Sequence, residues 1–133
     1  MRELTTLALL LVLTCPCTTW GAQAIETQLK RVVTETRKNL PMMLSEDIQA
    51  TNIGASGRTL INYYNFTRQK SEFYNLPGIV DNYRRNSIDA ACTNPGTRSF
   101  IDHNKGSIQY QFFDSKNVFV AKFTINAKTC RAR

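Results

Sequence analysis

Apolar and polar residues alternate in two runs near the C-terminal end of the chain, residues 106–113 and 118–126, and the polar residues 114–117 separate them. Two alternating runs joined by a short polar turn predict a β-hairpin. A turn centred on residues 115–116 gives the cross-strand pairs Phe112–Phe119, Tyr110–Ala121 and Ile108–Phe123. Because side chains alternate along a strand, these residues and Ile125 are expected on one buried aromatic face.

A second hairpin is predicted in the middle of the chain. A Ser-Gly turn separates the candidate strands 48–55 and 58–66, and such a turn between two strands is a hairpin signal. This turn would set Ile53 opposite Leu60. The strand 58–66 is apolar on both faces, which is typical of a central strand with helices covering it. Together the two hairpins predict an antiparallel four-stranded sheet.

Helical spacing of apolar residues predicts helices over residues 25–40 and 76–92. The stripe of the first helix consists of Ile25, Leu29, Val33, Thr36 and Leu40. Pro41 ends this helix, because proline disfavours helical backbone in the residue before it. A basic amphipathic helix lying on a membrane is the alternative, but the stripe is narrow and has no aromatic residue. Residues 67–75 are expected to form a polar connection or a short helix, and residues 97–104 one or two further helical turns.

The first 24 residues have the features of a signal peptide. Arg2 provides a positive start, residues 7–13 are an unbroken apolar run, and the small residues Ala22 and Ala24 fit a signal-peptidase site. The apolar run is shorter than the roughly 20 residues that cross a bilayer. The expected organisation is therefore a signal peptide, 1–24, followed by one α+β domain over 25–133; a buried N-terminal helix is the alternative.

Two cysteines within this leader raise a competing interpretation, a bacterial lipoprotein. Lipidation makes a cysteine the first mature residue and requires a small residue before it. Thr14 precedes Cys15 and Pro16 precedes Cys17, and both are poor matches. Release after Ala24 into the periplasm or the medium is favoured, and an outer-membrane lipoprotein is the less favoured localisation.

The mature chain retains Cys92 and Cys130. An even pair of cysteines in an exported protein predicts a disulfide. On the chain-entropy model, closing this loop would stabilise the fold by about 4 kcal/mol. A metal site or a thiol nucleophile lacks partner residues, because the chain has one histidine and no Cys-x-x-Cys motif after the leader.

The remaining polar residues indicate binding rather than catalysis. The formal net charge of +7 favours anionic partners, but the basic residues are scattered and do not alternate with aromatics, so no specific nucleic-acid binding is expected. Asp102 and His103 are adjacent and point apart on a helix, and Glu46 and Asp47 fit a turn. Nucleophile-elbow, phosphate-loop and zinc-protease motifs do not occur in the sequence. We therefore expect a protein that is no enzyme and carries no cofactor and no metal.

Several short motifs resemble one group of small exported proteins of Gram-negative bacteria. The matching residues are Leu40-Pro41, Glu46-Asp47, Tyr63-Tyr64, Cys92, Pro95, Arg98, Tyr110, Phe112-Phe113 and Cys130. The group includes the putative quorum-sensing-regulated virulence factor family and is similar in layout to the S-protein pilotins of type II secretion.

The resemblance implies helices packed on one antiparallel sheet, with one disulfide. Pilotins are lipoproteins that bind a segment of the outer-membrane secretin in a groove. Since neither Cys15 nor Cys17 lies in a good lipidation site, the resemblance favours a soluble relative. We expect a non-catalytic accessory protein of the bacterial envelope. It would bind a protein partner of the envelope and support a secretion or transfer apparatus. A secreted virulence-associated or inhibitor protein is the alternative.

Overall fold

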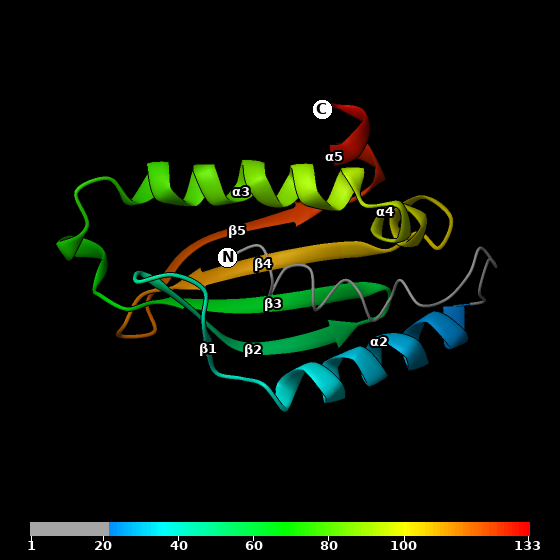
Figure 1. Cartoon of the computed structure of the whole chain (residues 1–133), viewed down its shortest axis with the longest axis horizontal. Helices are drawn as coiled ribbons and strands as arrows, with labels where there is room; N and C mark the ends of the chain where they lie inside the picture. The colour runs from blue at the N-terminus through cyan, green and yellow to red at the C-terminus, as the bar shows by residue number, and fades with distance from the viewer. Residues whose placement is uncertain (1–21) are drawn as a thin grey trace.

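The computed structural model describes residues 22–133 (Figure 1). The predicted signal peptide, including Cys15 and Cys17, lies outside these residues except for its last three, which begin the first described helix. The elements in chain order are α2 (Ala22–Arg37), β1 (Met42–Met43), β2 (Ile48–Ser56), β3 (Thr59–Phe66), the 3-10 helix η1 (Lys70–Glu72), α3 (Leu76–Thr93), α4 (Pro95–Asp102), β4 (Ser107–Phe113), β5 (Phe119–Ile125) and α5 (Ala127–Arg131).

The sheet has five strands in the order β1-β2-β3-β4-β5, and the pair β3–β4 is parallel. The predicted antiparallel four-stranded sheet is therefore wrong, although the α+β class holds. The chain between β3 and β4 forms η1, α3 and α4 and returns to the end of the sheet at which β3 began. Such a helical crossover makes the next strand parallel. The fifth strand, β1, has only two residues and no periodicity by which to predict it.

Both hairpins form, but their predicted registers are wrong by two residues. Leu60 pairs with Ala55 rather than Ile53, because the turn consists of Gly57 and Arg58. Gly57 has φ 58°, a left-handed conformation that suits glycine in a two-residue turn. In the second hairpin Phe112 pairs with Ala121.

A slip of two residues keeps every side chain on its expected face. The expected face of the C-terminal hairpin is accordingly buried at Ile108, Tyr110, Phe112 and Ile125. Phe119 is the exception. An irregularity at the Phe112–Phe113 step of the ladder leaves Val120 without a partner. Phe119 is consequently half exposed and packs edge-on against the Phe113 ring.

Helices cover one face of the sheet. Side chains of β3 and β4 alternate strictly between buried and half-exposed positions. Tyr83 of α3 packs against the rings of Tyr64, Tyr110 and Phe112 on the buried face. Helix α2 packs along β2 and buries the stripe Ile25, Leu29, Val32, Val33 and Thr36. It ends at Arg37, so Leu40 of the predicted stripe lies outside the helix. On the opposite face, the side chains of β3 and β4 are half-exposed among residues 22–133.

Asparagine caps and a disulfide fix the crossover helices. Asn75 accepts a hydrogen bond from the Gly78 N–H at the start of α3, and Asn94 accepts from two N–H groups of α4. Such caps satisfy backbone donors that a helix leaves unpaired. The predicted disulfide is present: Cys92 and Cys130 are bonded with their Cα atoms 5.5 Å apart. It joins the end of α3 to α5, a one-turn helix that the sequence analysis missed.

Candidate functional site

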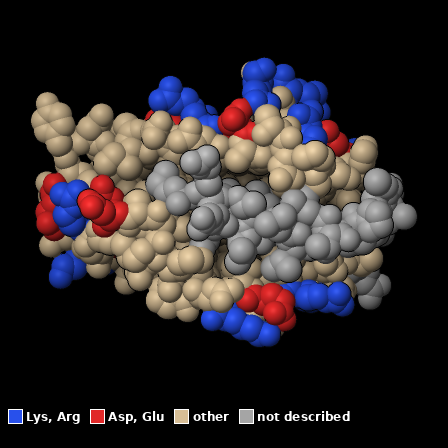
Figure 2. Space-filling model, viewed as in Figure 1, with Lys and Arg blue, Asp and Glu red and all other residues tan. Residues whose placement is uncertain are grey.

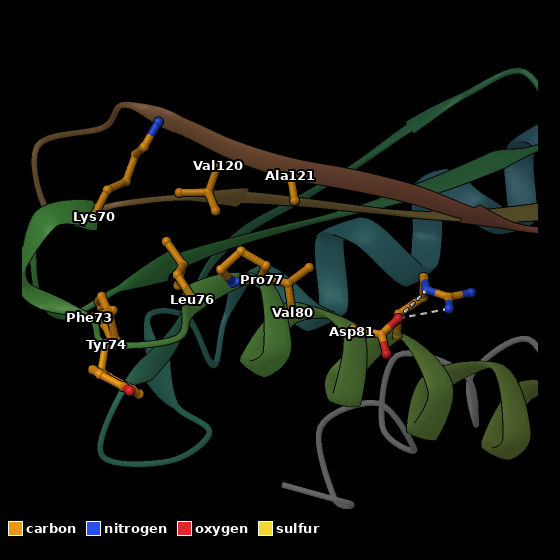
Figure 3. Close-up of a pocket in the computed structure, with 10 residues that line it drawn as sticks. Lys70, Phe73, Tyr74, Leu76, Pro77, Val80, Asp81, Val120 and Ala121 are labelled. Carbon is orange, nitrogen blue, oxygen red and sulfur yellow. Dashed lines mark hydrogen bonds and ion pairs between the residues drawn. The ribbon is translucent and has the colours of Figure 1, made fainter.

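A groove of about 600 Å³ lies between the N-terminal half of α3 and the edge strand β5 (Figure 3). Its apolar lining comes from Phe73, Leu76, Pro77, Val80, Val120 and Ala121. Pro77 is exposed and Val80 is half-buried, so apolar surface remains open to a ligand. The unpaired position of Val120 places this residue on the groove wall beside Ala121.

Charged residues mark the two ends of the groove. Lys70 of η1 lies at one end and Asp81 lies at the other (Figure 3), where Arg84 also lines the groove. Asp81 pairs with Arg84 at 2.8 Å and with Arg85 at 3.3 Å. The hydrogen bond from Arg84 lowers the pKa of Asp81 and, with the charges of both arginines, outweighs the opposing effect of desolvation. The Asp81 carboxylate is therefore charged and already paired at neutral pH.

An adjacent aromatic pair forms the rim beside Lys70. Phe73 packs edge-on against Phe66 with ring centroids 5.2 Å apart, and the guanidinium carbon of Arg68 lies 4.2 Å from the Phe73 ring centroid. Tyr74, by contrast, is fully exposed. Both residues also line a second hollow on the other side of the rim, with Asn82 and other polar residues. An exposed tyrosine next to a fixed phenylalanine is typical of a binding anchor, because aromatic residues are enriched at interfaces.

The rim is attached to the β4–β5 turn through Asp114. The Asp114 carboxylate is buried and accepts hydrogen bonds from the backbone N–H groups of Lys70 at 3.1 Å, Lys116 at 2.8 Å and Val118 at 2.9 Å. Burial raises the pKa of Asp114, but these three bonds and the charge of Lys70 together hold it below its ordinary value. Asp114 thus positions η1, and with it the aromatic rim, against the sheet.

The polar pairs considered in the sequence lie elsewhere. Asp102 accepts a hydrogen bond from Arg98 at 2.7 Å, while the ring of His103 contacts the Ser99 hydroxyl at 3.2 Å. Asp47 pairs with Arg68. Within residues 22–133, no three His, Cys, Asp or Glu side chains are grouped closely enough to hold a metal ion.

Sequence reasoning did not identify the groove residues. The aromatic pair Phe73-Tyr74 lies in a segment expected to be a polar connection or a short helix, and this pair is the one local signal of the groove in the sequence. Asp114 was assigned only to a turn. Among the helices of residues 22–133, none combines the length and apolar character needed to cross a bilayer.

Helices on one face of a five-stranded mixed sheet, together with one disulfide between the crossover and the C-terminal helix, define a two-layer α+β domain. Three solved structures are similar to it. A putative secreted protein of Pseudomonas aeruginosa is 24% identical with TM-score 0.69, over 86% of this chain and 100% of that one. The pilotin EpsS of the Vibrio vulnificus type 2 secretion system is 12% identical with TM-score 0.67, and the type II pilotin AspS of Vibrio cholerae is 14% identical with TM-score 0.62. Each of these two matches covers 82% of this chain and 94% of the pilotin.

These likenesses concern the fold, because all three identities are below 25%. The sequence predicted a resemblance in layout to pilotins, and this resemblance is confirmed for the fold. No family model and no curated protein matches the chain.

Proposed function

We propose that this protein is a non-catalytic binding module of the bacterial envelope that engages a segment of a partner protein in the groove between α3 and β5. The observation that carries the proposal is an open apolar groove with the fully exposed Tyr74 at its rim. Interfaces draw most of their affinity from a few such anchors. The fold shared with two pilotins of type II secretion systems supports an accessory role in secretion.

A rigid frame around the rim also supports the proposal. Phe73 is packed on Phe66, and Asp114 attaches η1 to the hairpin turn, so a partner would meet a surface that is already ordered. Pre-organisation of this kind reduces the entropy lost on binding. The half-buried Val80 and Val120 would become buried beneath the partner.

Site-specific photocross-linking in the native host tests the binding function. A benzophenone amino acid replaces Tyr74 at the groove rim (Figure 3) or, as the control, the half-exposed Tyr63 on the opposite face of the sheet. We expect a protein adduct of one defined mass from position 74 and none from position 63, and we expect Val80→Asp to abolish that adduct. Identical adducts from both positions, or none from position 74, would refute the proposal.

The proposal includes export and cleavage after Ala24. The intact mass of protein purified from the host should correspond to a chain that starts at Ile25 and contains one disulfide. A mass that starts at Cys15 or Cys17 and includes acyl chains would instead identify an outer-membrane lipoprotein.

One observation favours a second candidate, a secreted virulence-associated or inhibitor protein. The chain covers the whole of the putative secreted protein of Pseudomonas aeruginosa at 24% identity. Fractionation of host cultures separates the two candidates: recovery from the medium supports the secreted protein, and retention in the periplasm supports the envelope module.

A further inference from the structure

The groove continues along α3 as a longer track. A further hollow of about 350 Å³, the α3–α5 hollow, lies between α3 and α5 and is lined by Arg85, Ile88 and Arg133 among others. Arg84 lines both the groove and the hollow between α3 and α5, so the two meet at this residue. The combined track has Tyr74 at one end and Arg133 at the other, and residues of α3 from Leu76 to Asp89 line it.

Helix α3 contacts the edge strand β5 and lies along that margin of the sheet (Figure 1), while its Tyr83 ring reaches inward to Tyr64 of β3. Pro77, Val80 and Ile88 are consequently only partly covered. One further strand beside β5 would lie under these side chains and bury them. The helix therefore overhangs a position that a sixth strand would fill.

The two edges of the sheet differ in what protects them. On one side, β1 pairs with Gln49 and Ala50, and the Arg37 side chain donates to the Ile53 carbonyl oxygen at 3.1 Å. On the other side, β5 pairs with β4 alone among the strands of residues 22–133. At the C-terminal end of β5, the Thr129 hydroxyl donates a hydrogen bond to the Thr124 carbonyl oxygen at 3.3 Å, so this carbonyl already has a partner. Residues 119–123 thus form an edge, interrupted by the irregularity at Val120, to which a strand can add.

The track is polarised. Its Tyr74 end is mainly apolar, with Leu76, Pro77 and Val120, and also contains Lys70. Its other end contains three arginines, Arg84, Arg85 and Arg133, which pair with the two carboxylates of Asp81 and Asp89. Figure 2 shows Lys and Arg side chains gathered over this margin, along α3 and α5. The excess of positive charge suits a ligand whose acidic residues are concentrated at this end.

From these observations we infer that the partner segment is an extended peptide that adds to β5 as a sixth strand, with acidic residues against the α3–α5 arginines and alternating apolar residues under α3. This inference rests on the proposed binding function and specifies its ligand. The orientation is antiparallel to β5, because antiparallel pairing is the more stable per residue. Strand β5 runs from the Tyr74 end toward α5, so the acidic residues precede the apolar ones in the peptide.

A designed peptide tests the inference directly. The probe is fluorescein-labelled Glu-Asp-Glu-Thr-Val-Thr-Val-Thr-Ile-Thr, and its binding to the full mature protein is followed by fluorescence polarisation. Two versions carry N-methyl groups on alternate sets of backbone amides. Since only one set faces β5 in a strand, one version should bind at least about 10-fold more weakly than the other.

Charge and hydrogen exchange provide independent readouts. A peptide with lysine in place of its acidic residues should bind at least about 10-fold more weakly, as should the acidic peptide to Arg84→Glu/Arg133→Glu. The control Arg31→Glu, an exposed residue of α2, should change affinity by less than about twofold. Backbone amides of residues 119–123 should exchange more slowly with the peptide bound. Circular dichroism verifies that each variant folds.

Absence of binding, equal loss from both N-methylated sets, or unchanged exchange of residues 119–123 would overturn strand addition. Any of these results together with a persistent cross-link from position 74 would mean that the groove binds a segment in another conformation, such as a helix. Loss of the cross-link would refute the binding function itself. The two failures are therefore distinguishable.

Discussion

At the scale of single residues, Asp114 links the rim of the groove to the sheet. Replacement by alanine removes the acceptor of three backbone N–H groups, and unpaired buried donors are destabilising. We expect Asp114→Ala to lower the Tm by roughly 4–8 °C and to weaken ligand binding at the groove. Thermal unfolding followed by circular dichroism measures the first effect, and Glu26→Ala on the exposed face of α2 is the control.

The same residue predicts how stability depends on pH. The pKa of Asp114 lies below its reference value of 3.8 in the folded protein, so the unfolded chain takes up this proton first as the pH falls. The contribution of Asp114 is therefore complete above about pH 4 and is lost as the pH falls through the native pKa. Between pH 5 and pH 2, Asp114→Asn should lose less stability than the wild-type protein. Parallel curves for the two proteins in urea titrations would contradict this expectation.

The position of Gly106 leaves no room for a side chain. It precedes β4, and a Cβ atom there would overlap the ring of the buried Phe100. Overpacking of this kind costs about 1–3 kcal/mol, so Gly106→Ala should unfold at a lower urea concentration. At Gly54 the nearest side-chain atom, in Tyr63, lies 3.6 Å from such a Cβ, and Gly54→Ala should differ from the wild type by less than about 0.5 kcal/mol.

At the scale of elements, Asn94 joins α3 to α4. Its N–H bonds to Ala90 at the end of α3, while its side chain caps the N–H groups of Gly96 and Thr97. We expect Asn94→Ala to reduce the free energy of unfolding by about 1 kcal/mol. Asn94→Asp keeps the acceptor and adds a charge favourable at a helix N-terminus, so a loss as large as that of the alanine variant would rule out the capping explanation.

The elements also show what the sequence could and could not predict. Periodicity identified the helices α2 and α3 and the four longer strands, because each buries one face with a regular spacing. The predicted strand registers were wrong because the residues that form the two turns were assigned incorrectly. These are the turn at Gly57 and the loop organised by Asp114. The parallel pair was missed because strand direction depends on where the crossover ends. The groove was missed because its residues come from three separate segments, and no local pattern links Tyr74 to Val120.

At the scale of the whole molecule, the disulfide determines how the second half of the track is held. Cys130 lies on α5, which has five residues and contacts β5 and α3, and a helix this short is not stable alone. The bond to Cys92 spans 38 residues, so its removal should reduce the free energy of unfolding by up to about 4 kcal/mol on the chain-entropy model.

Two measurements separate this global effect from a local one. Cys92→Ala/Cys130→Ala and the reduced wild-type protein should unfold at the same lower urea concentration. Amides of α5 should lose more protection from hydrogen exchange than those of β3. Arg133 and Thr129 line the α3–α5 hollow. We therefore expect Cys92→Ala/Cys130→Ala to bind the designed peptide more weakly, because the contacts to the acidic end of the peptide are lost. Tyr74 should still contact the apolar end of the peptide. Full affinity in the variant would show that α5 is not needed to form the site.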